Sequence, residues 1–260
     1  MGLGQRERNR SLGAAVIGIG LALWASSAWA DGRAYGTTYQ AATEEKGELE
    51  VENWLTGAGD GEVGDSAPGG GLREMLELEY GLTSRWDLAL YNMLDLSKAE
   101  GGSRYAGLKV ESRYRFSDPG AWPVDVVGYL EYQWRRAGDA DQSLEAKAIV
   151  ARDFGPWNVA GNLSVEVERL LEGGFNPEME YALGVSRQLG GPAVTVGLET
   201  FGHLEHGAAT EPYLFVGPAI SFDFGHLGPL DELWLTLAGG KGLTTPSETP
   251  YARAIVGLEF

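Results

Sequence analysis

Residues 76–80 read Leu76-Glu77-Leu78-Glu79-Tyr80, and the short turn Thr83-Ser84-Arg85 separates them from Trp86. Apolar and acidic side chains alternate along this stretch. Because successive side chains of a β-strand point to opposite faces, the alternation predicts a strand with one apolar and one acidic face. Residues 163–168, Leu163-Ser164-Val165-Glu166-Val167-Glu168, continue in the same way. We therefore expect an all-β chain whose strands separate apolar from charged side chains.

Alternation and turn residues predict about twelve strands in the whole chain. Most approach the roughly 9–11 residues that a tilted strand needs to cross a bilayer. The expected ranges are 47–56, 71–82, 86–94, 106–116, 124–134, 142–154, 157–168, 178–189, 193–201, 212–222, 233–240 and 251–260.

The connections between these strands alternate in length. Residues 83–85, 155–156 and 190–192 form tight turns, whereas most of the other connections are longer and polar, at 57–70, 95–105, 169–177, 202–211 and 241–250. Short turns at the periplasmic end and long loops at the other end are typical of antiparallel up-and-down outer-membrane barrels. The connections 117–123 and 223–232 are longer than this arrangement predicts.

An alternation of apolar and charged faces is expected of both a soluble barrel and a membrane barrel. A soluble barrel turns its apolar face inward, and a membrane barrel turns it toward lipid. Aromatic side chains such as Tyr80, Trp86, Tyr114 and Trp157 fall on the apolar face beside strand ends, where an interfacial girdle is expected. The few charges on that face, Glu74, Arg152 and Arg187, also fall near strand ends, while Asn53 and Asn92 fit poorly. These features favour the membrane barrel.

The N-terminus has the form of a secretory signal peptide. Arg6, Arg8 and Arg10 precede an uncharged apolar segment that leads to Ala28-Trp29-Ala30, so cleavage is expected after Ala30. Removal of residues 1–30 takes away three Arg and one Glu and changes the formal net charge from −17 to −19. Such an acidic chain is a poor candidate for nucleic-acid binding. Without cysteine it uses neither disulfides nor thiolate metal sites.

Two local motifs resemble known outer-membrane proteins. Glu79-Tyr80-Gly81-Leu82-Thr83-Ser84-Arg85-Trp86-Asp87-Leu88 resembles the strand–turn–strand unit of small proteobacterial outer-membrane barrels, of the porin-like and phenol meta-pathway-type group. Tyr114–Pro119 and Val127–Tyr132 are similar to its next hairpin. The resemblance covers the first half of the mature chain. It implies a barrel and an expectation of transport, and it supplies no catalytic residues.

The alternation at the C-terminus resembles a sorting signal. Ala252, Ala254, Val256, Leu258 and Phe260 alternate back from the last residue. This pattern resembles the C-terminal strand that the barrel-insertion machinery reads. We therefore expect that machinery, and outer-membrane lipid, to be partners of a bacterial outer-membrane protein.

The acidic face predicts the lining of the barrel. We expect residues 31–46 to form a periplasmic N-terminal tail, with a lumenal position as the alternative, and residues 47–260 to form the barrel. The expected lumen-lining residues are Glu50, Glu77, Glu79, Asp87, Glu111, Arg113, Glu131, Glu145, Lys147, Glu166, Glu168, Glu180 and Glu199.

Two readings of the acidic lumen remain open. It can be a network of ion pairs, or a water-filled passage that favours cations. About eight strands fill a barrel with side chains and roughly 16–18 leave an open channel, so twelve strands allow either a narrow pore or a plugged barrel. A porin-like channel for small solutes is the leading hypothesis, and a non-conducting structural or binding barrel is the alternative.

Enzymatic and metal-binding functions have little support in the sequence. His203 and His206 lie on an expected outer loop without helical spacing or further ligands, which is a weak metal motif. A lipid hydrolase would need a Ser–His pair near the outer rim, for which Ser143 and His203 are the candidates. Neither residue lies in a recognisable nucleophile motif. We therefore expect no catalytic residues, no metal and no cofactor.

Overall fold

The computed structural model describes residues 32–59, 67, 70–97, 102–136, 140–191, 193–204, 213–244 and 249–260. The expected signal peptide, His206 and the central parts of several expected loops lie outside the described residues. Among the described residues there is no helix long and apolar enough to cross a membrane.

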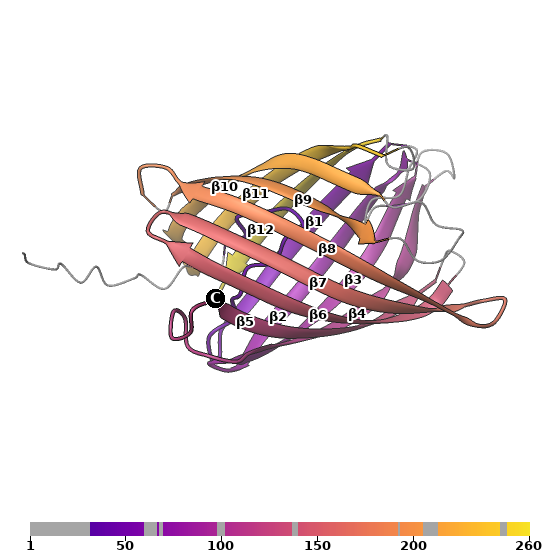
Figure 1. Ribbon diagram of the computed structural model, residues 1–260, viewed down its shortest axis with the longest axis horizontal. Helices are drawn as coiled ribbons and strands as arrows, with labels where there is room; N and C mark the ends of the chain where they lie inside the picture. The colour runs from indigo at the N-terminus through magenta and orange to yellow at the C-terminus, as the bar shows by residue number, and fades with distance from the viewer. Residues whose placement is uncertain are drawn as a thin grey trace, which may run out of the picture.

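Twelve antiparallel strands form one closed barrel (Figure 1). Each strand pairs with its neighbour in the sequence, and β1 pairs with β12 to close the ring, with Trp54 opposite Ile255. The strands are β1 (Leu49–Ala58), β2 (Leu72–Thr83), β3 (Trp86–Ser97), β4 (Gly102–Arg115), β5 (Asp125–Arg135), β6 (Ala140–Phe154), β7 (Trp157–Leu170), β8 (Phe175–Gln188), β9 (Val194–Leu204), β10 (Leu214–Leu227), β11 (Leu230–Gly242) and β12 (Pro250–Glu259). The predicted all-β, twelve-strand fold is therefore confirmed.

The apolar side chains lie on the outside of this barrel. In β2, Leu76 and Leu78 are 44% and 42% exposed, whereas Glu77 and Glu79 between them are 0% and 1% exposed. The same division holds in β7, where Leu163 and Val165 are exposed and Ser164 is buried. Large apolar patches on a surface mark contact with a partner or a membrane. An apolar exterior around a polar interior is the arrangement of a membrane barrel, and it is the reverse of a soluble one.

Asn53, which fits the apolar face poorly, has a partner on that face. Its Nδ2 donates a hydrogen bond to Glu74 Oε1 at 3.0 Å, and both side chains project outward from adjacent strands. A polar group removed from water costs less when it is hydrogen-bonded, so this pair offsets part of the cost of two polar residues on an apolar surface. The expected alternation is therefore kept through Asn53 without a change of face.

The hairpin between β10 and β11 differs from the expectation. The long connection predicted at residues 223–232 is wrong, because β10 continues to Leu227 and β11 begins at Leu230. Register shifts around Gly225 lie between Asp223 and Leu227. β-bulges interrupt the period-two alternation locally, which hides the continuation of the strands from a reading of the pattern.

Candidate functional site

The interior of the barrel contains the predicted charged residues. Each of these side chains points inward from its strand. Glu50, Glu77, Glu79, Asp87, Glu111, Arg113, Glu131, Glu145 and Glu199 are buried, and Lys147, Glu166, Glu168 and Glu180 are half-buried. The structure thus places all thirteen on the inner side, and their role in lining a passage stays a prediction.

The segment Gly32–Lys46 lies inside the barrel, close to the end where the tight turns are found (Figure 1). Ala34 and Tyr35 are each 1% exposed, so the wall of the barrel surrounds them. The expectation of a loose periplasmic tail is therefore wrong for this segment. The alternation rule carries no information here, because the segment has no strand pairing and is held by side chains from distant strands.

Glu199 of β9 is the main anchor of this segment. Its carboxylate accepts hydrogen bonds from the backbone N–H groups of Gly36 at 3.0 Å, Thr37 at 2.9 Å and Thr38 at 2.9 Å. The Thr38 hydroxyl donates a further bond to it at 3.2 Å. On the other side, Arg253 Nη1 of β12 donates to the Gly36 carbonyl oxygen at 2.8 Å. Hydrogen bonds to ionised groups are stronger than neutral ones, so this turn of the segment is firmly held.

Two tyrosines continue the attachment. The Tyr35 hydroxyl donates to Asn158 Oδ1 at 2.9 Å, and Asn162 exchanges two hydrogen bonds with the backbone of Tyr39, at 2.7 and 2.9 Å. Burial raises the pKa of both phenols to about 12. Gly184 faces the ring of Tyr35, and a Cβ there would lie 2.6 Å from it. A glycine is needed at this position because the ring occupies the space of a side chain.

Arg33 carries positive charge into the acidic interior. Its Nε lies 3.0 Å from Glu52 Oε1, and its guanidinium lies over the rings of Tyr39 and Trp54 at 4.7 and 4.5 Å. The Trp54 indole N–H donates in turn to Glu52 and Glu77. The segment therefore neutralises part of the wall that it packs against.

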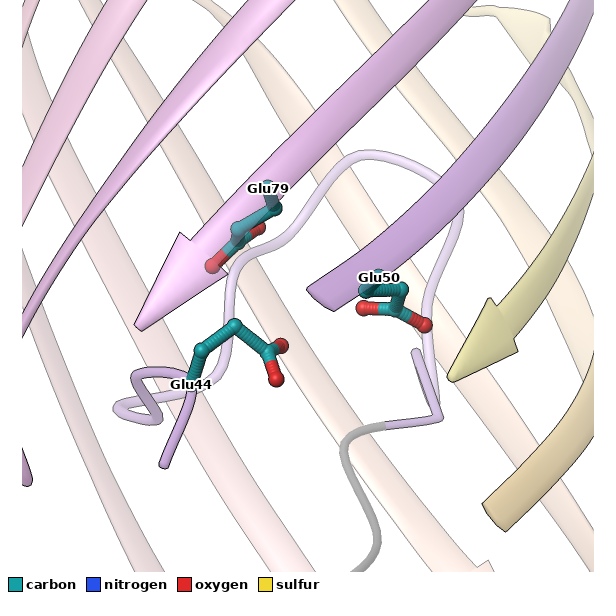
Figure 2. A group of neighbouring side chains, drawn as sticks. All are labelled: Glu44, Glu50 and Glu79. Carbon is teal, nitrogen blue, oxygen red and sulfur yellow. The ribbon is translucent and has the colours of Figure 1, made fainter. Parts of the chain in front are cut away.

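Glu44 brings a third carboxylate to two carboxylates of the wall. Figure 2 shows Glu44 of the segment facing Glu50 of β1 and Glu79 of β2, and one oxygen of each lies within 4.8 Å of the others. Such oxygen donors suit hard cations such as Ca²⁺. A cation of the protein already serves this region, because Arg113 forms ion pairs with both Glu79 and Asp87. The three carboxylates therefore form an acidic cluster with its own counter-charge.

Aromatic side chains fill part of the lumen farther from the tight turns. The rings of Phe201, Phe215 and Tyr251 pack against one another with centroids 5.2 to 5.8 Å apart. Tyr213 donates to Glu180 Oε1 at 2.8 Å. These lumenal aromatics were not among the predicted lining residues, nor were Trp54 and Asn162. The inward phase of the same alternation identifies them, since Trp54 follows Glu50 and Glu52 at a spacing of two.

The candidate hydrolase residues are not brought together. Ser143 on β6 lies opposite Glu168 of β7, and His203 on β9 lies opposite Glu180 of β8. His203 packs edge-on against Tyr213, with ring centroids 4.1 Å apart. Two strands separate Ser143 from His203 in the barrel wall. The geometry offers no Ser–His pair at these positions.

Comparison with known proteins identifies the fold class. No family model matches the chain, and no curated protein matches it in sequence. Among solved structures, an outer membrane channel from Pseudomonas putida F1 is similar with a TM-score of 0.59 at 11% identity, covering 84% of this chain and 97% of that one. The KdgM porin (TM-score 0.53) and the NanC porin (0.51) are each similar at 9% identity, covering 82% of this chain and 98% of theirs. The protein has the fold of the small outer-membrane channel barrels.

Proposed function

We propose that this protein is an outer-membrane channel for small solutes, with a lumen that favours cations and is narrowed by the segment Gly32–Lys46. One observation carries the proposal. Thirteen carboxylates and four Lys or Arg side chains are buried among the described residues of a barrel whose exterior is apolar. A charged passage with low-dielectric walls concentrates ions of the opposite sign, and rings of Asp or Glu favour cations.

Several features support the location. Exposed aromatics, including Tyr80, Tyr114 and Trp157, lie at strand ends, where membrane barrels carry their girdles. The predicted signal peptide and the terminal Phe260 suit export and insertion into the outer membrane. The similar folds include porins and an outer membrane channel.

The non-conducting barrel is the second candidate, and the tightness of the interior favours it. Between the segment and the wall, the space lined by Arg33, Tyr39, Glu52, Glu79 and Arg113 measures about 10 Å³. A cavity needs roughly 10–15 Å³ to hold one water molecule. The segment therefore packs closely against this part of the wall and narrows the lumen there.

The experiment is a comparison of two proteins in planar bilayers. The mature chain is expected to give small conductance steps with a reversal potential that reports cation preference in a KCl gradient. A variant lacking residues 32–46 keeps every strand, because β1 begins at Leu49, and it should give larger steps. Steps in the deletion variant alone would support a plugged barrel, and no steps in either protein would support a non-conducting one.

The source of the selectivity is tested by charge neutralisation in the lumen. Glu166 and Glu168 both pair with Arg135, so changing both to Gln removes two negative charges beside that cation. Cation preference should then fall, whereas Asp118→Asn with Glu172→Gln, which neutralises two exposed turn residues, should leave it unchanged. Anion preference in the parent protein would contradict the proposed role of the acidic lumen.

A further inference from the structure

A groove crosses the outer face of strands β4 to β7. It has a volume of about 520 Å³, and its lining alternates between small and large side chains. The small ones are Ser112, Gly128, Ala146 and Ala148, and the large ones are Tyr114, Leu130, Leu163 and Val165. The register places Gly128 between Tyr114 and Ala148, and Ala146 between Leu130 and Val165. The ring of Phe116 covers Gly128, where a Cβ would lie 3.2 Å from Phe116 Cε2. Ser112, Ala146 and Ala148 therefore form the floor, and the longer side chains form the walls.

We propose that this groove binds one acyl chain of a glycerophospholipid from the membrane leaflet beside the tight turns. The inference rests on the proposed location of the barrel in a membrane. Surrounding lipid is as apolar as the groove, so burial alone gives no preference for it. Close packing in the groove gives the acyl chain a preference for it, because each methylene then contacts the protein on more than one side.

Two arginines on the same outer face supply a site for the headgroup. Arg152 projects from β6 on the same outer face as Ala148. It follows Ala148 by four residues, so it lies about 13 Å closer to the turn at a rise of roughly 3.3 Å per residue. Its Nη1 donates to the Trp122 carbonyl oxygen at 2.8 Å. Arg187 of β8 lies over the ring of Trp157, 5.2 Å from its centroid.

Neither arginine forms a direct ion pair within the described part of the chain, although Arg152 interacts electrostatically with the adjacent Asp153. No described carboxylate oxygen lies within 4.0 Å of either guanidinium, and the adjacent Asp153 accepts a hydrogen bond from Asn158 instead. By contrast, Arg85 in the neighbouring turn lies 2.8 Å from Asp118. In a chain of net charge −17, two such cations at the edge of an apolar face are complementary to a phosphate group.

The position selects the kind of lipid. The groove extends from the middle of the strands toward the tight turns, and both arginines lie near those turns, which form the periplasmic end of an outer-membrane barrel. Phospholipid forms the leaflet at that end, and lipopolysaccharide forms the opposite one. A phosphodiester at Arg152 with one acyl chain over Ala148 and Ala146 meets both the charge and the shape.

Native mass spectrometry of the refolded mature chain tests this assignment. The probes are dioleoyl phosphatidylglycerol and, in a parallel arm, lipid A. The parent protein is expected to retain one phosphatidylglycerol molecule. Ala148→Leu, which fills the floor, and Arg152→Gln, which removes the phosphate partner, should each lower retention about tenfold.

Matched controls separate the site from general lipid contact. Ala252→Leu enlarges an exposed outward alanine on β12, and Arg85→Gln removes an arginine already paired with Asp118. Both should retain lipid like the parent. Equal retention in all five proteins, preference for lipid A, or a protein dimer that Ala148→Leu abolishes would each overturn the proposal.

Two measurements distinguish the absence of the lipid site from a wrong membrane location. Heat-modifiable migration on a gel reports whether each variant has folded as a barrel. Proteins that fold and insert but retain lipid equally would refute the lipid site alone. A parent chain that does not insert into membranes would refute the membrane location as well.

Discussion

At the scale of single residues, Glu199 connects the wall of the barrel to the segment within it. Its carboxylate accepts hydrogen bonds from three backbone N–H groups and the Thr38 hydroxyl of the segment, and from the Tyr251 hydroxyl of β12. The inward position of Glu199 could be predicted, because side-chain alternation is a local property of a strand. Its partners in the segment could not be predicted, because they lie more than 160 positions away and the segment has no pattern of its own.

Removal of this carboxylate should release the segment. The chain has no cysteine, so Thr37→Cys introduces a single thiol. The substitution keeps the backbone N–H of residue 37, which donates a hydrogen bond to Glu199. Hydrogen bonds to charged groups contribute about 1.5–3 kcal/mol each, and every 1.4 kcal/mol is a factor of about ten in an equilibrium. In this Thr37→Cys background, Glu199→Ala should raise the rate at which maleimide labels the introduced thiol at least tenfold. Glu166→Ala, in the lumen but away from the segment, serves as the control, and equal rates in the two variants would show that Glu199 is not the anchor.

At the scale of elements, each strand has two faces with different environments. On β7, Val165 is 43% exposed on the outside and Glu166 is half-buried inside beside Arg135. The sequence predicted these faces on every strand, because period two survives wherever the strand is regular. It failed at the β10–β11 hairpin, where register shifts interrupt the period, and at Gly32–Lys46, which pairs with no strand.

A charge on the outer face of β7 should oppose membrane insertion. Val165→Arg is expected to lower the free energy of unfolding by about 2–4 kcal/mol, the cost of a cation near the middle of a bilayer. Glu166→Gln changes the charge inside the barrel and should cost less. Urea titrations of both variants refolded into lipid vesicles measure this order, and the reverse order would mean that the faces of β7 are exchanged.

At the scale of the whole molecule, the apolar exterior determines where the folded protein is stable. Large exposed side chains surround the barrel, among them Leu78, Leu130, Leu163 and Leu198. Folded mature protein is therefore expected in the outer-membrane fraction, extractable by detergent and heat-modifiable on gels. Fractionation of expressing cells provides the measurement. Recovery of the folded barrel from the soluble periplasm, without detergent, would contradict a membrane location.

The position of Gly32–Lys46 also constrains the order in which the barrel can be assembled. The ring is complete only when β1 pairs with β12, and the segment that precedes β1 lies within that ring. Arg253 of β12 contacts the segment directly at Gly36. Either the segment enters the curved sheet before the seam is joined, or it must thread into a finished ring whose interior is already crowded. The first route needs no reopening, so the segment can act as an internal template on which the seam closes.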